Sequence, residues 1–137
     1  MEIIIALNDA ISKAEVVKLY KEVKWSAADK PDKLLRALRN SDSLVTARLD
    51  NKLIAIANAI SDGYLVVYYP HLIVHPSHQR QGIGKRIMGI LNKKYESFHQ
   101  QMITADADAI KFYTNIGFVK AGSTESMWIY EGNDHSK

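Results

Sequence analysis

The segment from Val74 to Arg86 combines two glycines with the basic side chains Arg80, Lys85 and Arg86. Apolar residues recur at helical spacing from residue 83 to about residue 97, which predicts a helix that begins beside these glycines. The first N–H groups of a helix have no partner within it, and the helix dipole adds partial positive charge there. Gly82 and Gly84 let the backbone approach an anion closely. The segment therefore predicts a binding site for a phosphate or a pyrophosphate.

Two familiar nucleotide-binding patterns do not fit this segment. A Walker loop reads G-x-x-x-x-G-K-[ST], but Gln79 stands at its first position and Arg86 at its last. A Rossmann fingerprint reads G-x-G-x-x-G, but Ile87 stands where its third glycine should be. The segment does match the pattern Q/R-x-x-G-x-G/A, between a β-rich stretch and the predicted helix.

Composition excludes several other classes of site. The chain has 137 residues, a net charge of +3 and 47% apolar residues, a balance typical of one globular domain. It has no cysteine, which rules out disulfides, thiolate zinc sites and a cysteine acyl-enzyme. We expect no metal, because the five histidines lack paired ligand spacing. We expect no nucleic-acid partner, because the net charge is modest and Tyr95 is the one aromatic near the basic run.

The sequence also predicts no membrane partner. Its longest stretch without formal charge, Gly63 to Gln79, is interrupted by Pro70 and Pro76. No basic residue precedes the apolar run at residues 3–7, as a secretory signal would require. We therefore expect a cytoplasmic location, which the absence of cysteine fits.

The elements that must position the anion site predict an α/β fold in one domain over residues 1–137, with a frayed polar tail at 131–137. Their order is β-α-α-β-β-β-α-β-α-β-β. The predicted strands are 2–7, 44–49, 53–60, 64–74, 102–105, 118–121 and 127–130, the last two as a hairpin that closes the sheet. The predicted helices are 13–23, one that begins near residue 30, 83–97 and 107–115.

Local signals mark several of these boundaries. Ser12 and Glu15 have the spacing of a capping box at the start of the first helix. Asp29 is a possible N-cap of the second helix. Pro70 should interrupt its strand, because proline has no N–H to donate to a ladder. Gly117 should end the last helix as its C′ residue.

A second motif adds to the pattern at residues 79–84. The pattern A-x-x-F-Y-x-x-x-G-F appears as Ala109, Phe112, Tyr113, Gly117 and Phe118. With both motifs, the chain resembles the GCN5-related N-acetyltransferase (GNAT) family over nearly its whole length. It is most similar to the small plastid-type serotonin or arylalkylamine acetyltransferases and their bacterial relatives. That narrower resemblance rests on residues 59–62, 105–106 and 127–130.

The resemblance implies a mixed, mostly antiparallel sheet with helices on both faces and a splay between the fourth and fifth strands. Acetyl-CoA would lie in that V-shaped slot as co-substrate, its pantetheine arm paired to strand 64–74 like an extra strand. The pyrophosphate would sit on the N–H groups of residues 80–85. The implied cofactor-binding residues are Leu72, Ile73, Val74, Gln79, Arg80, Gln81, Gly82, Ile83, Gly84, Lys85 and Phe112.

The implied reaction is transfer of an acetyl group to the primary amine of a small molecule. Without cysteine, direct attack in a ternary complex is favoured over an acyl-enzyme. Tyr113 resembles the family's general acid, which protonates the leaving thiolate, although it could also simply pack its helix. The general base stays open between Asp106, His71 and a water relay, and an N-cap is the alternative role for Asp106. A backbone N–H near residues 73–74 could hold the oxyanion.

Acceptor specificity should come from the first two helices and their connection. Tyr20 and Trp25 are candidates to line the acceptor pocket, with Trp128 at its rim, and core packing is the alternative for each. The chain could be a monomer or a homodimer. Two other functions remain open, a protein or peptide N-acetyltransferase and a non-catalytic acyl-CoA-binding sensor.

Overall fold

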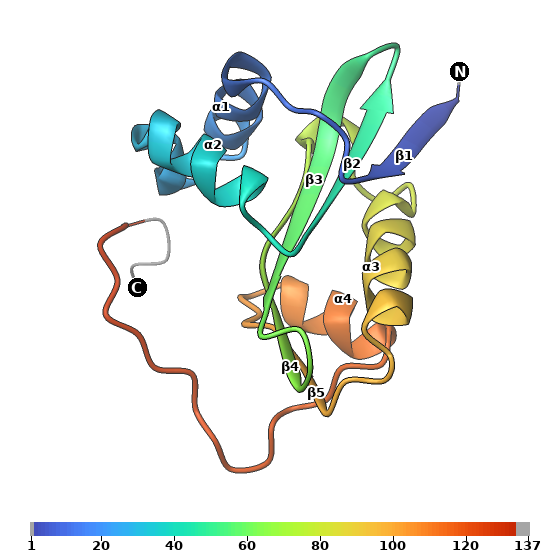
Figure 1. Cartoon of the computed structure of the whole chain (residues 1–137), viewed down its shortest axis with the longest axis vertical. Coiled ribbons are helices and arrows are strands. Elements are labelled where there is room, and N and C mark those ends of the chain that lie inside the picture. Colours follow the sequence, from blue (N-terminus) through green and yellow to red (C-terminus); the bar gives the residue numbers. More distant parts are fainter. Residues whose placement is uncertain (1, 134–137) are drawn as a thin grey trace.

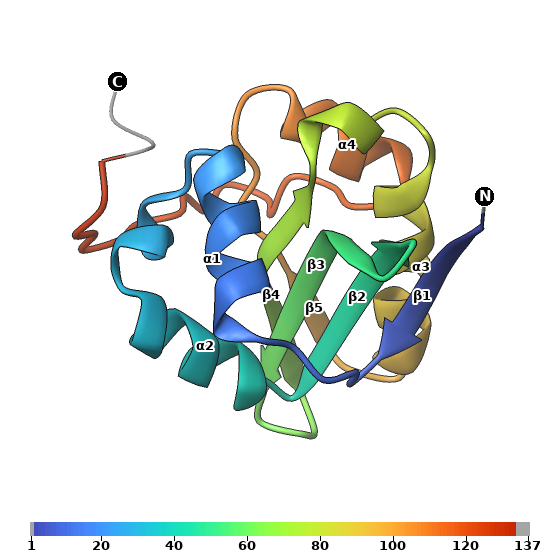
Figure 2. The same ribbon diagram turned by 90° about the horizontal axis from the view of Figure 1, so that it is seen from above.

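The computed structural model describes residues 2–133 and contains one five-stranded sheet with helices on both faces (Figure 1, Figure 2). Its strands are β1 (Ile3–Leu7), β2 (Ser43–Leu49), β3 (Lys52–Ser61), β4 (Val66–Val74) and β5 (Gln100–Met102). Its helices are α1 (Lys13–Glu22), α2 (Pro31–Arg39), α3 (Ile83–Lys94) and α4 (Ala109–Asn115). Two 3-10 turns, η1 (Ser26–Asp29) and η2 (Pro76–His78), precede α2 and α3.

The strands lie in the order β1-β2-β3-β4-β5. The first three pairings are antiparallel and the last, between β4 and β5, is parallel. The predicted class, an α/β fold with a mixed and mostly antiparallel sheet, is therefore confirmed. Within residues 2–133, none of the helices has the length and apolar character that a bilayer-spanning segment needs.

Two apolar clusters, one on each face of the sheet, hold the layers together. On one face, α1 and α2 contribute buried residues that include Val16, Leu19, Leu34 and Leu38. On the other face, α3 contributes Ile83, Ile87, Met88 and Leu91. Each fully buried aliphatic side chain of this kind stabilises the fold by about 1.5–3 kcal/mol. This packing fixes the positions of α1 and α3 on the two faces of the sheet.

Strand β4 contains one residue more than its neighbour β3 in the middle of their pairing. Asn58 pairs with His71 and Ile60 with Tyr68, so a single residue of β3 lies opposite two residues of β4. Pro70 is one of those two, which agrees with the interruption that the sequence predicts at this proline. Such a β-bulge bends the strand and changes the direction of the side chains that follow it.

The parallel pair β4–β5 is short and leaves most of β4 without a second neighbour. Residues 66–68 of β4 pair with residues 100–102 of β5, and the described sheet has no register pair beyond them. Residues 69–74 of β4 therefore have an open edge on the side away from β3. This is the splay between the fourth and fifth strands that the family resemblance implies.

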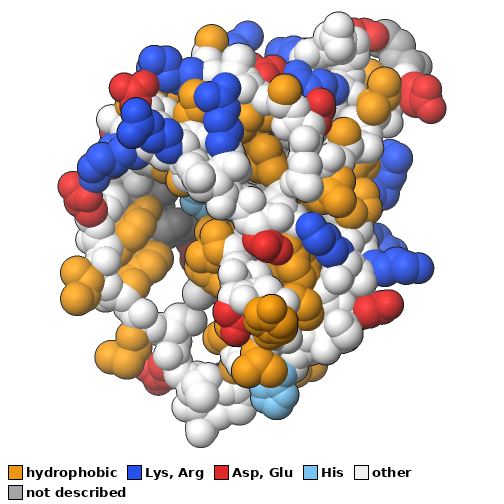
Figure 3. Space-filling view, in the orientation of Figure 1, with side chains coloured by type: hydrophobic (Ala, Val, Ile, Leu, Met, Phe, Trp, Pro, Cys, Tyr) orange, Lys and Arg blue, Asp and Glu red, His pale blue; other side chains and the backbone are white. Residues whose placement is uncertain are grey.

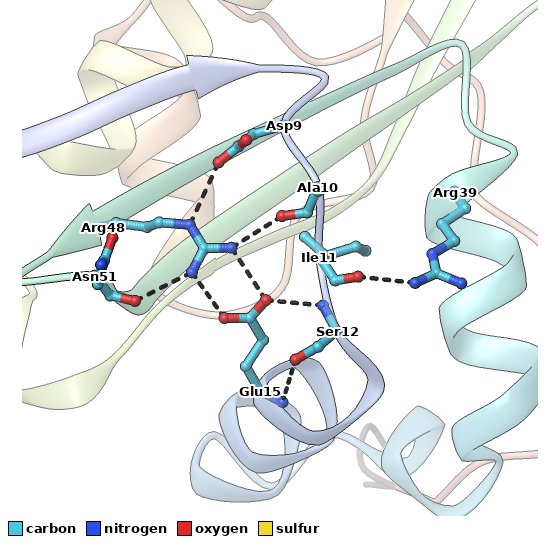
Figure 4. A network of polar contacts seen from close by, with 8 residues as sticks. All are labelled: Asp9, Ala10, Ile11, Ser12, Glu15, Arg39, Arg48 and Asn51. Carbon is cyan, nitrogen blue, oxygen red and sulfur yellow. Dashed lines mark hydrogen bonds and ion pairs between the residues drawn. The ribbon is translucent and has the colours of Figure 1, made fainter.

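A polar network joins the start of α1 to strand β2 (Figure 4). The predicted capping box is present, because Ser12 Oγ accepts from the Glu15 N–H and the Glu15 carboxylate accepts from the Ser12 N–H. The same carboxylate accepts two hydrogen bonds from Arg48, at 2.7 and 3.0 Å. Arg48 also donates to Asp9 and to the carbonyl oxygens of Ala10 and Asn51.

Replacing Arg48 by alanine is expected to lower the free energy of unfolding by about 2 kcal/mol, because two carboxylates lose their shared donor. Urea denaturation at neutral pH measures this loss. Arg39→Ala is the control, since it removes one hydrogen bond to the carbonyl of Ile11, and it should cost about 1 kcal/mol. Equal losses for the two variants would contradict a special role for the Arg48 network.

The network also predicts how stability depends on pH. The hydrogen bond from Arg48 is the largest of several effects that hold the pKa of Glu15 below its ordinary value of 4.5. A carboxylate with a lowered pKa stabilises the fold above its unfolded pKa, and this contribution disappears as pH falls through the folded value. As pH falls below 4.5, the free energy of unfolding should therefore decrease more steeply for the unaltered protein than for Glu15→Gln.

Two local predictions are wrong. Asp29 is not the N-cap of α2, because the chain makes the 3-10 turn η1 first and Lys30 takes the cap position. Residues 118–121 and 127–130 do not form a hairpin, because the described chain contains no strand after α4 and passes the ends of β4 and β5 as an extended arm (Figure 1). At three residues, β5 offers few ladder positions to hold such a hairpin.

Residues 118–133 instead form an extended C-terminal arm. Apolar side chains lie on both sides of an opening between the arm and the body (Figure 3). Val119 and Met127 are among its most exposed side chains, at 85% and 91%. The arm returns to the body at η1, where Tyr130 contacts Ser26 and Glu131 pairs with Lys30. Most of the predicted frayed tail, residues 134–137, lies outside the described residues.

Candidate active site

The open edge of β4 can pair with an extended ligand through two of its residues. His71 donates its backbone N–H to Asn58 Oδ1 and His75 donates to the carbonyl of Ile54, so both point toward β3. Backbone groups alternate in direction along a strand. Leu72 and Val74 therefore direct their N–H and carbonyl groups to the open edge. Of the three predicted residues, these two favour pantetheine pairing, while the backbone of Ile73 faces β3.

The predicted anion site lies next to that edge, at the start of α3. Gly82 is the N-cap residue and has a left-handed backbone with φ of +81°, which favours glycine. The N–H groups of residues 83–85 follow it and form the unpartnered first turn of a 12-residue helix. Arg80, Gln81 and Lys85 are exposed around this turn. Gln79 folds back and donates to the carbonyl of Val74 at 3.0 Å, which ties the loop to the strand.

Phe112 packs against the start of α3, and this contact explains why the second glycine of the motif, Gly84, has no side chain. A Cβ atom at Gly84 would lie 3.3 Å from Cζ of Phe112 and 3.8 Å from Cδ2 of Leu72. A side chain here would push the aromatic ring of α4 away from α3. The structure thus brings the predicted residues Phe112, Gly84 and Leu72 together as one wall between β4, α3 and α4.

Tyr113 lies beside Phe112 and is almost fully buried. Its ring contacts Phe112 and Phe118 edge-on, with centroids 5.0 and 5.5 Å apart. Burial, helped by the nearby Tyr68, raises the pKa of Tyr113 to about 12. The hydroxyl therefore keeps its proton at neutral pH, as a group that donates a proton must.

His71, Tyr20 and Trp25 form an aromatic cluster on the α1 side of β4. Tyr20 Oη lies 2.7 Å from His71 Nδ1. The ring of Trp25 meets both other rings at right angles, with centroids 5.1 Å from His71 and 6.0 Å from Tyr20. Tyr20 has no exposed surface, so its contact with the site runs through His71 and Trp25.

Asp106 and Asp62 lie in different surroundings. Asp106 is exposed between β5 and α4, and its carbonyl accepts from the N–H of Ala109. Asp108 occupies the N-cap position of α4, and its side chain makes no capping hydrogen bond, so Asp106 is not the N-cap. Asp62 accepts from three successive backbone N–H groups at residues 64–66, which lowers its pKa and fixes the β3–β4 turn.

Sequence reasoning missed one side-chain hydrogen bond beside the site, between His75 and Glu22. His75 Nδ1 accepts from the Ser77 N–H, so Nε2 carries the proton that it donates to the Glu22 carboxylate at 2.7 Å. This hydrogen bond lowers the pKa of Glu22. One signal was available, because an acid in the last turn of a helix opposes the helix dipole and implies a partner elsewhere.

A pocket of about 380 Å³ lies between the α1–η1 connection and the end of β4. Its lining residues are Glu22, Val23, Lys24, Trp25, Leu72, Ile73, Val74, Pro76 and Gln79. The pocket thus adjoins both the open edge of β4 and the aromatic cluster. Trp128 lies outside this lining and stacks on Tyr130 of the C-terminal arm at 4.3 Å. Among residues 2–133 there is no group of three or more potential metal ligands.

Comparisons with known proteins agree with this geometry. Residues 9–128 match the family model of the acetyltransferase (GNAT) domain. Over 127 residues the chain is 29% identical to an uncharacterized N-acetyltransferase, ycf52, of Gracilaria tenuistipitata var. liui, covering 87% of this chain and 68% of that one. The ycf52 protein of Porphyra purpurea is 30% identical over 113 residues, covering 77% and 64%.

Solved structures show the same fold. A GNAT family acetyltransferase from Streptococcus pneumoniae TIGR4 superimposes with a TM-score of 0.81 and 26% identity, covering 96% of this chain and all of that one. The aminoglycoside N-acetyltransferase AAC(6')-Iy, solved in complex with CoA, gives a TM-score of 0.71 at 16% identity, covering 96% and 95%.

Proposed function

Because the chain belongs to the GNAT family of acetyltransferases, we propose that it transfers an acetyl group from acetyl-CoA to the primary amine of a small molecule. The observation that supports this proposal best is the open edge of β4 beside the N-terminus of α3. One end of this surface suits a peptide-like pantetheine arm, and the other suits a pyrophosphate. The wall of Leu72, Gly84 and Phe112 lies between them.

We propose that both substrates bind before the chemistry occurs. The amine attacks the thioester carbonyl, a C–N bond forms, the C–S bond breaks and CoA leaves as thiolate. With no cysteine in the chain, no thiol is available to hold the acetyl group on the enzyme. The attacking nitrogen loses a proton to a base or a water relay, and Tyr113 gives its own proton to the thiolate. A backbone N–H of β4 holds the carbonyl oxygen as negative charge develops on it.

The pocket supports a small acceptor with one amine and an aromatic or apolar body. Its volume of about 380 Å³ falls within the range of small-ligand sites. Among the described lining residues, Glu22 is the one acid and Lys24 the one base, a balance that disfavours an acceptor with many positive charges. The ring of Trp25 offers a surface for an aromatic body. An arylalkylamine is therefore the acceptor class that we propose.

A panel of acceptors tests this proposal directly. Purified protein is mixed with acetyl-CoA and aryl-alkylamines, polyamines, aminoglycosides or basic peptides, and free CoA is followed with a thiol reagent. The chain has no cysteine, so the protein itself gives no background in this assay. We expect release with arylalkylamines at the highest kcat/KM. Release only with peptides would overturn the acceptor class, and silence together with a CoA-induced rise in Tm would favour an acyl-CoA sensor.

A further inference from the structure

The C-terminal arm carries five large apolar or aromatic side chains that its own copy leaves uncovered to a large extent. Val119, Met127 and Ile129 are 85%, 91% and 108% exposed, and Trp128 and Tyr130 are 61% and 42% exposed. Together they expose on the order of 600 Å², on the scale that large side chains bury in cores and interfaces. Exposed apolar patches of about this size on a monomer mark interaction sites. The arm is therefore a surface that another protein surface should cover.

The outer edge of β5, on the side away from β4, offers a complementary surface. Gln100 donates its backbone N–H to the carbonyl of Leu65 at 3.0 Å, so its backbone points toward β4. Because backbone groups alternate in direction along a strand, the N–H and carbonyl of Gln101 point to the outer edge. Within residues 2–133, no strand lies beyond β5. Such an edge is a template on which a further strand can pair.

The arm of the same chain does not cover that edge in the structure. The arm begins at Phe118, whose ring packs on Tyr113 and whose N–H donates to the Tyr113 carbonyl. It returns to the body at η1, where Tyr130 contacts Ser26. Between these two points, an opening with apolar side chains on both sides separates the arm from the body (Figure 3).

We propose that two copies of the chain exchange their arms, so that residues 127–130 of each copy pair as a strand with the outer edge of β5 in the other. This segment reads Met-Trp-Ile-Tyr, and its aromatic and β-branched residues favour a strand. Each copy offers the same two surfaces, so the exchange closes as a two-fold pair. The side chains of each arm supply much of the roughly 800 Å² that one partner buries in a stable dimer.

The contact that holds the end of the arm to its own body is weak enough to be exchanged. Glu131 pairs there with Lys30, and their side chains are 82% and 47% exposed. An exposed ion pair contributes little to stability, because water solvates both charges when it opens. Releasing the arm from η1 therefore costs little compared with covering its apolar side chains on a second copy.

Sedimentation equilibrium of the full chain at micromolar concentration tests the exchange. We expect twice the chain mass of 15.4 kDa for the unaltered protein. The double variant Met127→Asp with Ile129→Asp should have the mass of one chain and an unchanged far-UV circular dichroism spectrum, because both side chains are exposed. Ile4→Asp is the matched control, since it makes the same change at a 63% exposed side chain of β1, the opposite edge of the sheet. It should remain a dimer.

Amide hydrogen exchange then locates the contact. The N–H of Gln101 should exchange about tenfold more slowly in the unaltered protein than in the double variant, because only the dimer covers it. The N–H of Gln100 is bonded to Leu65 in either state and serves as the internal control. A single-chain mass for the unaltered protein, a dimer that survives the double variant, or equal Gln101 rates would overturn the inference. These measurements need neither acetyl-CoA nor an acceptor, so their outcome is independent of the proposed function.

Discussion

Replacing Tyr113 by phenylalanine is expected to lower kcat about a hundredfold, because a positioned general acid contributes about 10²–10⁴-fold to rate. The ring stays in place between Phe112 and Phe118, so the wall of Leu72, Gly84 and Phe112 is preserved. KM for acetyl-CoA and the Kd for CoA should therefore remain nearly unchanged. Steady-state kinetics and calorimetric titration with CoA separate the two effects.

The pH dependence gives the same prediction a second readout. With the pKa of Tyr113 raised to about 12, the acid stays protonated throughout the range in which the enzyme is stable. Ionisation of Tyr113 would remove the proton donor only as pH rises toward that value, so no alkaline loss of kcat near pH 10 should come from this residue. A loss of kcat near pH 10 that the unaltered enzyme shows and Tyr113→Phe does not would contradict the conclusion that burial raises the pKa of Tyr113.

Tyr64→Phe is the control for this substitution. Tyr64 is 83% exposed in the turn between β3 and β4, and its change should leave kcat and Tm as they are. A Tyr113→Phe enzyme with full kcat would remove Tyr113 from the reaction and return it to the role of packing α4. Loss of CoA binding in that variant would point to a structural defect instead.

Replacing Gly82 by alanine is expected to weaken CoA binding about tenfold. Gly82 has φ of +81° at the N-cap of α3, and an L-residue pays about 1–2 kcal/mol to adopt that conformation. A shift of the backbone to a relaxed conformation would turn the first N–H groups of the helix away from the pyrophosphate. Tenfold corresponds to about 1.4 kcal/mol, within the range of that strain. Calorimetric titration with CoA measures the change in Kd.

Two further variants isolate the cause. Gly82→Asn should bind CoA more tightly than Gly82→Ala, because asparagine tolerates the left-handed region. Gly63→Ala places the same strain, at φ of +87°, in the β3–β4 turn, and neither glycine has an atom that a Cβ would meet. Gly63→Ala should lower stability without changing Kd for CoA. Equal Kd values for Gly82→Ala and Gly63→Ala would show that the helix start does not bind the pyrophosphate.

The parts of the fold and of the site that the sequence predicts well are those defined by neighbouring residues. The capping box of Ser12 and Glu15, the glycine at the start of α3 and the last helix each depend on residues a few positions apart. Their backbone geometry follows from local steric and hydrogen-bonding preferences. Phe112 and Tyr113 could be placed with them, because their motif contains Gly117, which has the expected positive φ.

The contacts that the sequence could not predict join residues far apart. Tyr20 meets His71 across 51 positions, and Glu22 meets His75 across 53. No periodicity links such pairs, and only the packing of α1 over β4 brings them together. The predicted hairpin in the C-terminal arm is wrong for a related reason. Its composition favours a strand, but a strand needs a neighbour, and local sequence does not say which edge is available.

The extra residue in β4 determines which side chains of this strand face α1 and which face α3. Val67 and Tyr69 pack into the α3 cluster before the bulge, whereas Leu72 and Val74 pack there after it. His71 and Ile73 are thereby turned to α1. If the same residues continued from Val67 in regular alternation, without the bulge, Leu72 and Val74 would face α1 and His71 would lie in the apolar cluster under α3. The chemical identity of the site therefore depends on the bulge in the strand as much as on the residue types.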